Sequence, residues 1–169
     1  MTYHARALPW PMNQEYAMND DALLDALRAT CAQMPPVVAM RMALRRFDGT
    51  RLHTTAPLAA NVNDKGTAFG GSLVALMTLA GWALTTLQLR KAGLDAEVYV
   101  ADSQVRYRAP LLDELVAQAW LAPEADWAGF IDTFVRRGKA RATLLAQVLL
   151  PDGGVAAELS GRYVALAKR

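Results

Sequence analysis

The chain lacks several features that define common classes of protein. Its 169 residues include one cysteine, Cys31, so no disulfide can form within the chain, and we expect a reducing, cytoplasmic location. The formal net charge of +2 is too small to indicate nucleic-acid binding. Residues 1–18 lack the apolar stretch of a secretory signal peptide. We predict that residues 1–18 form a loosely ordered arm and that residues 19–169 form one domain.

Catalytic motifs are also scarce. The sequence has no Gly-x-Ser-x-Gly, which excludes the nucleophile elbow of α/β-hydrolases. Only two histidines occur: His4 lies in the predicted arm, and His53 lies in a threonine-rich segment where a surface or half-buried position is more common than a catalytic one. No group of cysteines and histidines has the spacing of metal ligands, so we expect no metal site.

The most prominent feature that is present is an uncharged stretch from Gly66 to Leu89, long enough to span a bilayer. Threonines, glycines and a glutamine interrupt it, and its strongly apolar part, about residues 73–84, is shorter than the roughly 20 residues that a membrane span needs. A helix that is apolar on nearly all sides is buried either in lipid or in protein. We therefore predict a core helix over about residues 70–89 and no membrane span.

The other segments indicate one short helix and several strands. Residues 22–34 form an amphipathic pattern, with Asn19 or Asp20 as N-cap and Pro35-Pro36 as the stop. Residues 37–47 and 50–58 flank Asp48-Gly49 and predict a hairpin. Four strand-like segments follow the core helix, the last two joined at Asp152-Gly153-Gly154, and residues 127–137 fit either a strand or a helical turn.

This order of elements predicts an α+β fold. An antiparallel sheet needs one face covered, and only the helix over residues 70–89 is apolar enough to cover it. The small residues of this helix would let strands approach closely. We expect a long central helix wrapped by a curved antiparallel sheet of about five to six strands.

Three motifs give the sequence a resemblance to hotdog-fold thioesterases, specifically to the YiiD C-terminal type. Asn63, Gly66, Phe69, Gly70 and Gly71 form Asn-x-x-Gly-x-x-Phe-Gly-Gly, which is similar to the Asn-x-x-Gly-x-x-His-Gly-Gly of phenylacetate-type acyl-CoA thioesterases. ADSQVRYRAP at residues 101–110 and the hairpin at residues 138–164 resemble the central strand and last hairpin of the family. The resemblance covers about residues 20–167.

The resemblance implies a hotdog fold and hydrolysis of an acyl-CoA or acyl-carrier-protein thioester. Coenzyme A would be part of the substrate, and no separate cofactor is expected. Hotdog chains generally pair edge to edge with sites between subunits, so we expect a homodimer or a dimer of dimers. Such pairing would also protect an open sheet edge.

The start of the core helix offers what thioester cleavage needs. A helix N-terminus has free N–H groups and the positive end of the helix dipole, which stabilise a developing oxyanion. We assign Gly70 and Gly71 to this site, Gly71 as the better donor, with Gly66 and Phe69 beside the substrate. The glycine pair alternatively only eases helix entry. Asn63 either positions the attacking water or thioester, or caps the loop through its side chain.

The general base is where the sequence departs from the family. Nine residues beyond Phe69, where related enzymes have Asp or Glu, this chain has Thr78, which can orient water or act as an activated nucleophile but needs another group to take the proton. By resemblance the best-placed carboxylate is Asp102, which alternatively anchors the loop before the helix. In a regular strand Ser103 points to the opposite face from Asp102.

The densest basic run contains Arg137, Lys139 and Arg141, which either hold the phosphates of coenzyme A or form a solvated strand start. Two other functions compete with hydrolysis. The absence of a carboxylate at Thr78 favours a non-catalytic acyl-CoA-binding or regulatory module. The YiiD-type segment can also occur fused to an acetyltransferase-like domain, which allows a structural interaction domain.

Overall fold

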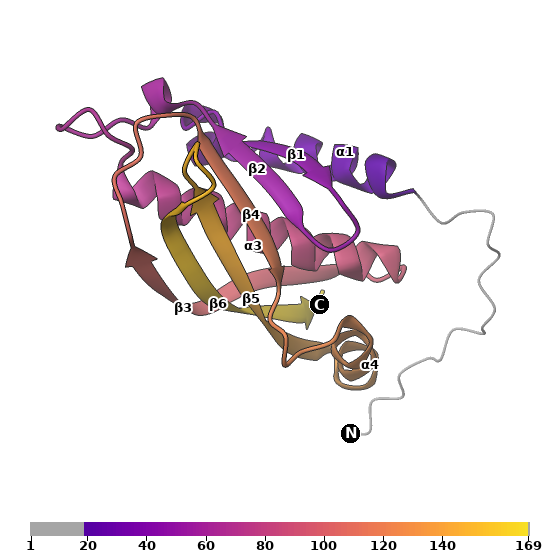
Figure 1. The fold of residues 1–169 in the computed structure, drawn as a ribbon. Coiled ribbons are helices and arrows are strands. Elements are labelled where there is room, and N and C mark those ends of the chain that lie inside the picture. Colours follow the sequence, from indigo (N-terminus) through magenta and orange to yellow (C-terminus); the bar gives the residue numbers. More distant parts are fainter. Residues whose placement is uncertain (1–18, 169) are drawn as a thin grey trace.

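The computed structural model describes residues 19–168; the predicted arm, residues 1–18, lies outside the described residues, as does Arg169. The described part of the chain combines helices and strands, with strands mostly following one another in pairs (Figure 1). In order, these are α1 (Asp20–Cys31), α2 (Pro35–Ala39), β1 (Ala43–Phe47), β2 (Leu52–Ala56), the 3₁₀ turn η2 (Leu58–Ala60), α3 (Gly70–Lys91), β3 (Ala96–Tyr107), β4 (Leu115–Leu121), α4 (Trp127–Arg137), β5 (Lys139–Leu149) and β6 (Val155–Ala167).

The strands form one antiparallel sheet of six strands in the order β1-β2-β4-β5-β6-β3. The sheet curves around α3, which runs across its concave face (Figure 1). Both predicted hairpins are present, β1–β2 around Asp48-Gly49 and β5–β6 around Asp152-Gly153-Gly154. The expected α+β architecture of a wrapped central helix is therefore confirmed.

The uncharged stretch forms the core helix that the sequence predicts. Within residues 19–168, α3 is the one helix long and apolar enough to cross a membrane, but 72% of its most apolar window is buried inside the protein. The last turn carries Arg90 and Lys91, where cations favour the negative end of the helix dipole. No acidic residue occupies the first turn, so the positive end at Gly70 is not neutralised by its own helix.

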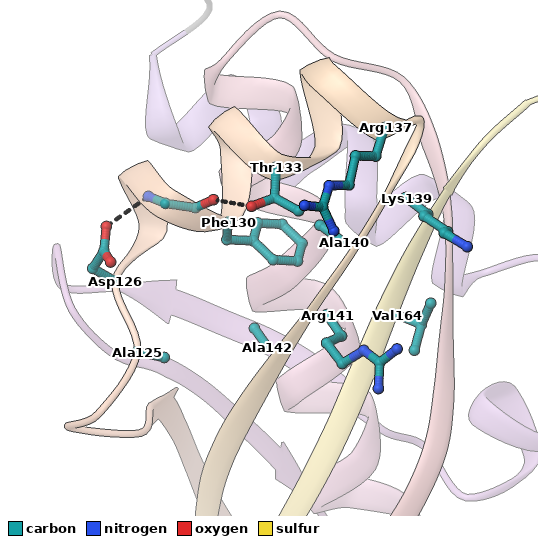
Figure 2. Close-up of a pocket in the computed structure, with 11 residues that line it drawn as sticks. Ala125, Asp126, Phe130, Thr133, Arg137, Lys139, Ala140, Arg141, Ala142 and Val164 are labelled. Carbon is teal, nitrogen blue, oxygen red and sulfur yellow. Dashed lines mark hydrogen bonds between the residues drawn. The ribbon is translucent and has the colours of Figure 1, made fainter.

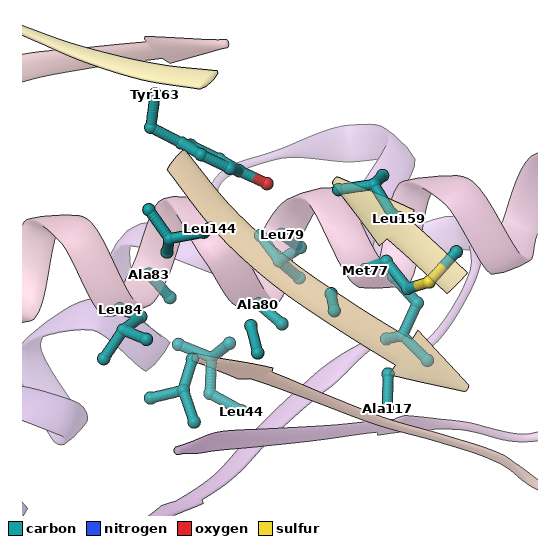
Figure 3. Close-up of a cluster of buried hydrophobic side chains, with 14 of the residues drawn as sticks. Leu44, Met77, Leu79, Ala80, Ala83, Leu84, Ala117, Leu144, Leu159 and Tyr163 are labelled. Atoms are coloured by element: carbon teal, nitrogen blue, oxygen red, sulfur yellow. The ribbon is translucent and has the colours of Figure 1, made fainter. Parts of the chain in front are cut away.

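Small residues on α3 allow strands to pack closely against it, as expected. A methyl group on Gly81 would overlap the Tyr163 ring. Tyr163 on β6 is fully buried, and its hydroxyl donates to the backbone carbonyl of Thr78 at 3.2 Å. Figure 3 shows Tyr163 and Leu144 reaching from the strands toward α3, with Ala80 and Met77 on the helix among the same core side chains. Burial also raises the pKa of the Tyr163 phenol, so it remains a neutral donor.

Helix α1 also follows the prediction. The side chain of Asn19 accepts a hydrogen bond from the Ala22 N–H at 2.8 Å and caps the helix. The four residues of the expected apolar stripe are all buried: Leu23, Leu24, Leu27 and Cys31. Burial raises the pKa of the Cys31 thiol, which fits an inert packing residue.

Two segments depart from the expected order of helix, two strands, helix and four strands. Pro35-Pro36, expected only to end a helix, begins the helix α2, and residues 37–39, expected to begin a strand, belong to it, because proline favours the first turn of a helix. Arg41 then adopts a left-handed φ of 52°, and β1 begins only at Ala43.

The segment that fitted either a strand or a helical turn is the three-turn helix α4. Asp126 caps it by accepting from the Gly129 N–H at 2.6 Å, and Phe130 and Phe134 are buried on one face. Gly138 is the left-handed C-cap residue of this helix, with a φ of 66°.

Strand β3 forms one edge of the sheet and pairs only with β6 among the described residues. It is 12 residues long, and most of its side chains are exposed. A bulge between Val100 and Asp102 interrupts its register with β6. A long open edge of this kind is a template for pairing with another strand.

Candidate active site

The loop before α3 is fastened by Asn63. Its side-chain oxygen accepts hydrogen bonds from the Lys65 and Thr67 N–H groups, at 2.9 and 3.1 Å, and its amide donates to Thr67 Oγ1 at 2.9 Å. The Gly66 N–H donates to the Asn63 carbonyl at 3.2 Å, and Gly66 has a φ of 77°, which only glycine adopts easily. These bonds favour the loop-capping alternative for Asn63, and they give Gly66 a conformational role.

The first two N–H groups of α3 are available to a ligand. Within the described part of the chain, neither the Gly70 N–H nor the Gly71 N–H donates to a protein acceptor. The N-cap residue, Phe69, provides no side-chain cap. Gly71 is exposed. Two unsatisfied donors at the positive end of a 22-residue helix form a favourable place for an oxyanion.

Two aromatic side chains flank these donors. The Phe69 ring, 53% exposed, lies so close to Gly71 that a methyl group there would overlap it. On the other side, Tyr107 of β3 is 59% exposed, and its hydroxyl donates to the Gly70 carbonyl at 3.3 Å. A methyl group on Gly70 would lie 3.2 Å from the Tyr107 ring. The glycines therefore serve packing around the donors and leave the donors open, so both predicted roles are compatible with the structure.

Thr78 lies on the same side of α3 as Gly71. Between Gly71 and Leu87, the partly or fully exposed residues of the helix follow helical spacing and form a stripe that the sheet does not cover: Gly71, Val74, Ala75, Thr78 and Trp82. The Thr78 hydroxyl makes no hydrogen bond to a carboxylate among residues 19–168. At 1.5 Å per residue, Thr78 is about 10 Å along the axis from Gly71, too far for both to contact one carbonyl group.

Asp102 faces away from this stripe. It pairs across β3 and β6 with Arg162, and Arg162 Nε lies 2.8 Å from Asp102 Oδ2. Arg162 is exposed while its neighbour Tyr163 points inward to α3, so the Asp102–Arg162 pair lies on the outer face of the sheet. The pair with Arg162 also holds the pKa of Asp102 below its usual value. Ser103, opposite Gly161, points to the other face, as predicted.

This placement does not favour Asp102 as the base for α3 of its own chain. It also does not anchor the loop before the helix, the alternative that the sequence offered, because its partner is on β6. The loop is held instead by Asn63 and by the Ala68 N–H, which donates to the Leu111 carbonyl at 2.8 Å.

The three predicted cations gather around a separate cavity. Arg137, Lys139 and Arg141 line a cavity of about 450 Å³ between α4 and β5, with Phe130 and Thr133 on its α4 side (Figure 2). None of the three cations pairs with a carboxylate within residues 19–168. The one carboxylate in the lining, Asp126, already caps Gly129. Unpaired cations around a hollow are suited to a polyanionic group.

This cavity is distant from Gly71 within one chain. Arg141 pairs with Val164, which pairs with Tyr99, whereas Tyr107 contacts Gly70. Eight residues of β3 separate Tyr99 from Tyr107, or roughly 26 Å at about 3.3 Å per residue. The structure thus brings the loop, the two glycines and Phe69 together, but it leaves the cations at the other end of the sheet.

His53 has a structural environment, in agreement with the sequence. Its Nε2 lies 2.7 Å from Asp48 Oδ2, which ties β2 to the hairpin turn. This contact is the main cause that lowers the pKa of the Asp48 carboxyl. No group of three residues among His, Cys, Asp and Glu lies close enough to hold a metal ion in the part of the chain that the structure describes.

Comparison with known proteins identifies the family. Residues 24–167 match the family model described as "Putative thioesterase (yiiD_Cterm)". The chain belongs to the YiiD C-terminal thioesterase family. This match covers nearly the whole described chain and includes both the glycine loop and the basic cavity.

Solved structures agree with this assignment. A protein of unknown function from Chlorobaculum tepidum TLS is 28% identical, with a TM-score of 0.84, over 90% of this chain and 99% of that one. The structure titled a putative thioesterase from Shewanella oneidensis is 32% identical, with a TM-score of 0.77, over 86% of this chain and 99% of that one. The structure of a thioesterase from Haemophilus influenzae is 15% identical, with a TM-score of 0.65, over 85% of this chain and 90% of that one. This similarity supports the hotdog fold alone.

Two residues of this YiiD-type domain were missed as site candidates. Tyr107 stood in the strand motif that carried the resemblance, but only tertiary structure shows that it reaches Gly70. Asn61 is buried, and its amide donates to the Met40 and Pro57 carbonyls at 2.8 Å each. Its position two residues before Asn63 was a signal that a second amide fastens the loop.

Proposed function

We propose that this protein hydrolyses acyl-CoA or acyl-carrier-protein thioesters at the start of α3. The observation that carries the proposal is the pair of free N–H groups at Gly70 and Gly71, at an uncapped and exposed helix N-terminus, in a chain of a thioesterase family. Such donors are already oriented where the carbonyl oxygen gains negative charge.

The reaction would proceed in two steps. The thioester oxygen accepts hydrogen bonds from the Gly70 and Gly71 N–H groups while water attacks the carbonyl carbon. The intermediate then collapses, the C–S bond breaks, and the thiolate takes the proton that the water has lost. The products are a carboxylic acid and a free thiol. A threonine hydroxyl can orient the water, but it is no base near neutral pH.

We assign the basic cavity to the phosphates of coenzyme A. Three unpaired cations, Arg137, Lys139 and Arg141, surround a hollow large enough for such a group. Replacing all three by alanine should raise KM for acyl-CoA by at least about tenfold, because hydrogen bonds to charged groups are lost. The matched substrate is the same acyl group on pantetheine, which lacks the phosphates, and its KM should not change. Equal changes for both substrates would contradict the assignment.

A homodimer would bring these separated parts together. The open edge of β3 suits antiparallel pairing with β3 of a second copy, and two-fold symmetry makes the two surfaces equivalent. Full overlap of the two strands would set Tyr107 beside the Tyr99 end of the partner subunit's β3, the end next to its basic cavity. A dimer of dimers and a cytoplasmic location stay predictions.

Subunit mixing tests this arrangement. One variant carries Gly71→Ala, which removes the site but keeps the cations, and the other carries the three cation-to-alanine changes. Mixed dimers recover one complete site only if Gly71 and the cations that serve it come from different subunits. We expect activity to rise after the two variants are unfolded and refolded together. If mixed dimers are confirmed by mass but activity is not recovered, Gly71 and the cations that serve it belong to the same chain.

The decisive experiment for hydrolysis is a panel of acyl-CoAs monitored for release of free thiol. Turnover whose kcat/KM falls by about 100-fold in Gly71→Ala supports the enzyme. Thr78 has no carboxylate partner, which favours a second candidate, an acyl-CoA-binding regulatory module. Tight binding without thiol release would establish that module and end the proposal of hydrolysis.

A further inference from the structure

A second cavity opens along α3, and no residue lines both it and the basic cavity. It has a volume of about 370 Å³ and lies between α2, α3 and β3. Its walls include three methionines of the α2 segment, Met34, Met40 and Met42, together with Thr78 and Trp82 of α3 and Val100 of β3. We call it the methionine groove.

The groove continues the exposed stripe that starts at Gly71. Ala75, Thr78 and Trp82 belong to both, so a chain leaving the carbonyl site along α3 enters the groove without crossing the core. Eleven residues separate Gly71 from Trp82, which is about 16 Å at 1.5 Å per residue. An extended hydrocarbon advances roughly 1.25 Å per carbon, given C–C bonds of about 1.5 Å. The distance corresponds to about thirteen carbons.

The chemistry of the walls selects a neutral and flexible occupant. None of the residues that line the groove is charged. Tyr99 contributes a hydroxyl, but this hydroxyl donates to Glu97 at 2.9 Å, so Thr78 is left as the polar group nearest the carbonyl end. Methionine side chains are unbranched and adapt to irregular apolar shapes. A cavity of this size is typical of small-molecule sites.

We propose that the methionine groove binds the acyl chain of the substrate, and that the substrate carries an unbranched aliphatic chain of about thirteen carbons. This inference rests on the proposed function, since it starts the chain at Gly71. Trp82 forms the far end of the groove and sets the longest chain that fits.

The test compares chain lengths in Trp82→Ala and in Trp120→Ala. Trp120 is the matched control, because it lies outside the groove. Its ring lies under the guanidinium of Arg51, with 4.7 Å between Arg51 Cζ and the ring centroid. In the wild type, kcat/KM for straight-chain acyl-CoAs should rise by about fourfold per methylene until the groove is full. Trp82→Ala should move the optimum to longer chains, and Trp120→Ala should keep the wild-type profile.

A second variant fills the groove. Val37→Phe adds volume on the α2 wall and should move the optimum to shorter chains. Trp82→Ala and Val37→Phe are also measured for binding of S-alkyl-CoA thioethers, which cannot be hydrolysed. If no acyl-CoA is turned over, but thioether affinity depends on chain length and the preferred length shifts in both variants, the groove binds the alkyl chain and the proposal of hydrolysis is wrong.

Two results would overturn the groove. One is a profile that does not depend on chain length, or that is the same in the wild type and in Trp82→Ala. The other is a Trp82→Ala or Val37→Phe protein whose molecular mass in solution differs from that of the wild type while its chain-length profile does not. That result would make the groove a contact between subunits.

Discussion

Two glycines of α3 show how one residue type serves two purposes in one helix. At the start, Gly71 is exposed, and the Phe69 ring occupies the space that a methyl group would need. In the middle, Gly81 is buried, and the Tyr163 ring occupies the corresponding space. Both positions exclude a side chain, but only the first lies beside free backbone donors.

The difference between them is what surrounds the backbone. Around Gly81 every helical N–H is paired within the helix, so close approach of β6 gains only packing. Around Gly71 the helix has just begun, so close approach exposes N–H groups to a ligand. Substitution should therefore separate activity from stability at these two positions.

The largest effect is expected for Gly71→Ala. The methyl group would displace the Phe69 ring and stand beside the free N–H groups, so kcat/KM should fall by about 100-fold, the scale of losing an oxyanion donor. The free energy of unfolding should stay within about 0.5 kcal/mol of the wild type, because the position is exposed. Steady-state kinetics and urea unfolding measure the two quantities.

The double variant Gly71→Ala/Phe69→Ala distinguishes two causes of this loss. Removing the ring relieves the overlap but leaves the methyl group beside the donors. Activity should remain low if the donors act on the substrate. Recovery to the wild-type rate would show that the position of Phe69, and not access to the N–H groups, was responsible.

Gly81→Ala should have the opposite signature. Overpacking against the buried Tyr163 ring costs about 1–3 kcal/mol, of which the better helix propensity of alanine recovers roughly 0.5–1 kcal/mol. Urea unfolding should show the net loss, and kcat per folded molecule should be unchanged. Adding Tyr163→Phe, which removes the hydroxyl nearest the new methyl group, should restore part of the stability. A variant as stable as the wild type would contradict this packing.

The smallest effect is expected on the outer face of the sheet, for Asp102→Asn. The pair that it breaks is exposed, so kcat/KM should change by less than about threefold. Because Arg162 lowers the pKa of Asp102, the carboxylate is ionised throughout pH 5–8, and its contribution to stability is lost only as the pH falls through that lowered pKa. The pH profile should match the wild type. If Asp102→Asn instead lowers kcat/KM by about 100-fold and removes the acidic limb of the pH profile, Asp102 is the base.

The sequence predicted local structure correctly where the residues of a segment fitted one kind of element only. The uncharged stretch, the Asn19 cap and the two Asp-Gly hairpins all appear as expected. Prediction failed where residue types have two uses. Pro35-Pro36 starts α2 because a first helical turn needs no N–H from proline, and Val37 and Val38 were interpreted as strand from their β-branched side chains.

The candidate site divides in the same way. The run from Asn63 to Gly71 is continuous, so its residues stay together in any compact fold, and the sequence alone could place them at a helix start. Asp102 could not be placed, because a strand offers two faces and its partner, Arg162, is 60 residues away. The approach of Tyr107 to Gly70, across 37 residues, was equally out of reach.

By itself the sequence determined the buried helix, its glycine-bearing start and the absence of a carboxylate at Thr78. Hydrophobic periodicity and turn residues act over a few positions, and those features depend on nothing further. Tertiary structure alone decided which side chains face the start of α3, that Asp102 does not, and that the three cations surround a cavity at the far end of the sheet. Strand register sets those relations, and it is fixed by packing between residues distant in sequence.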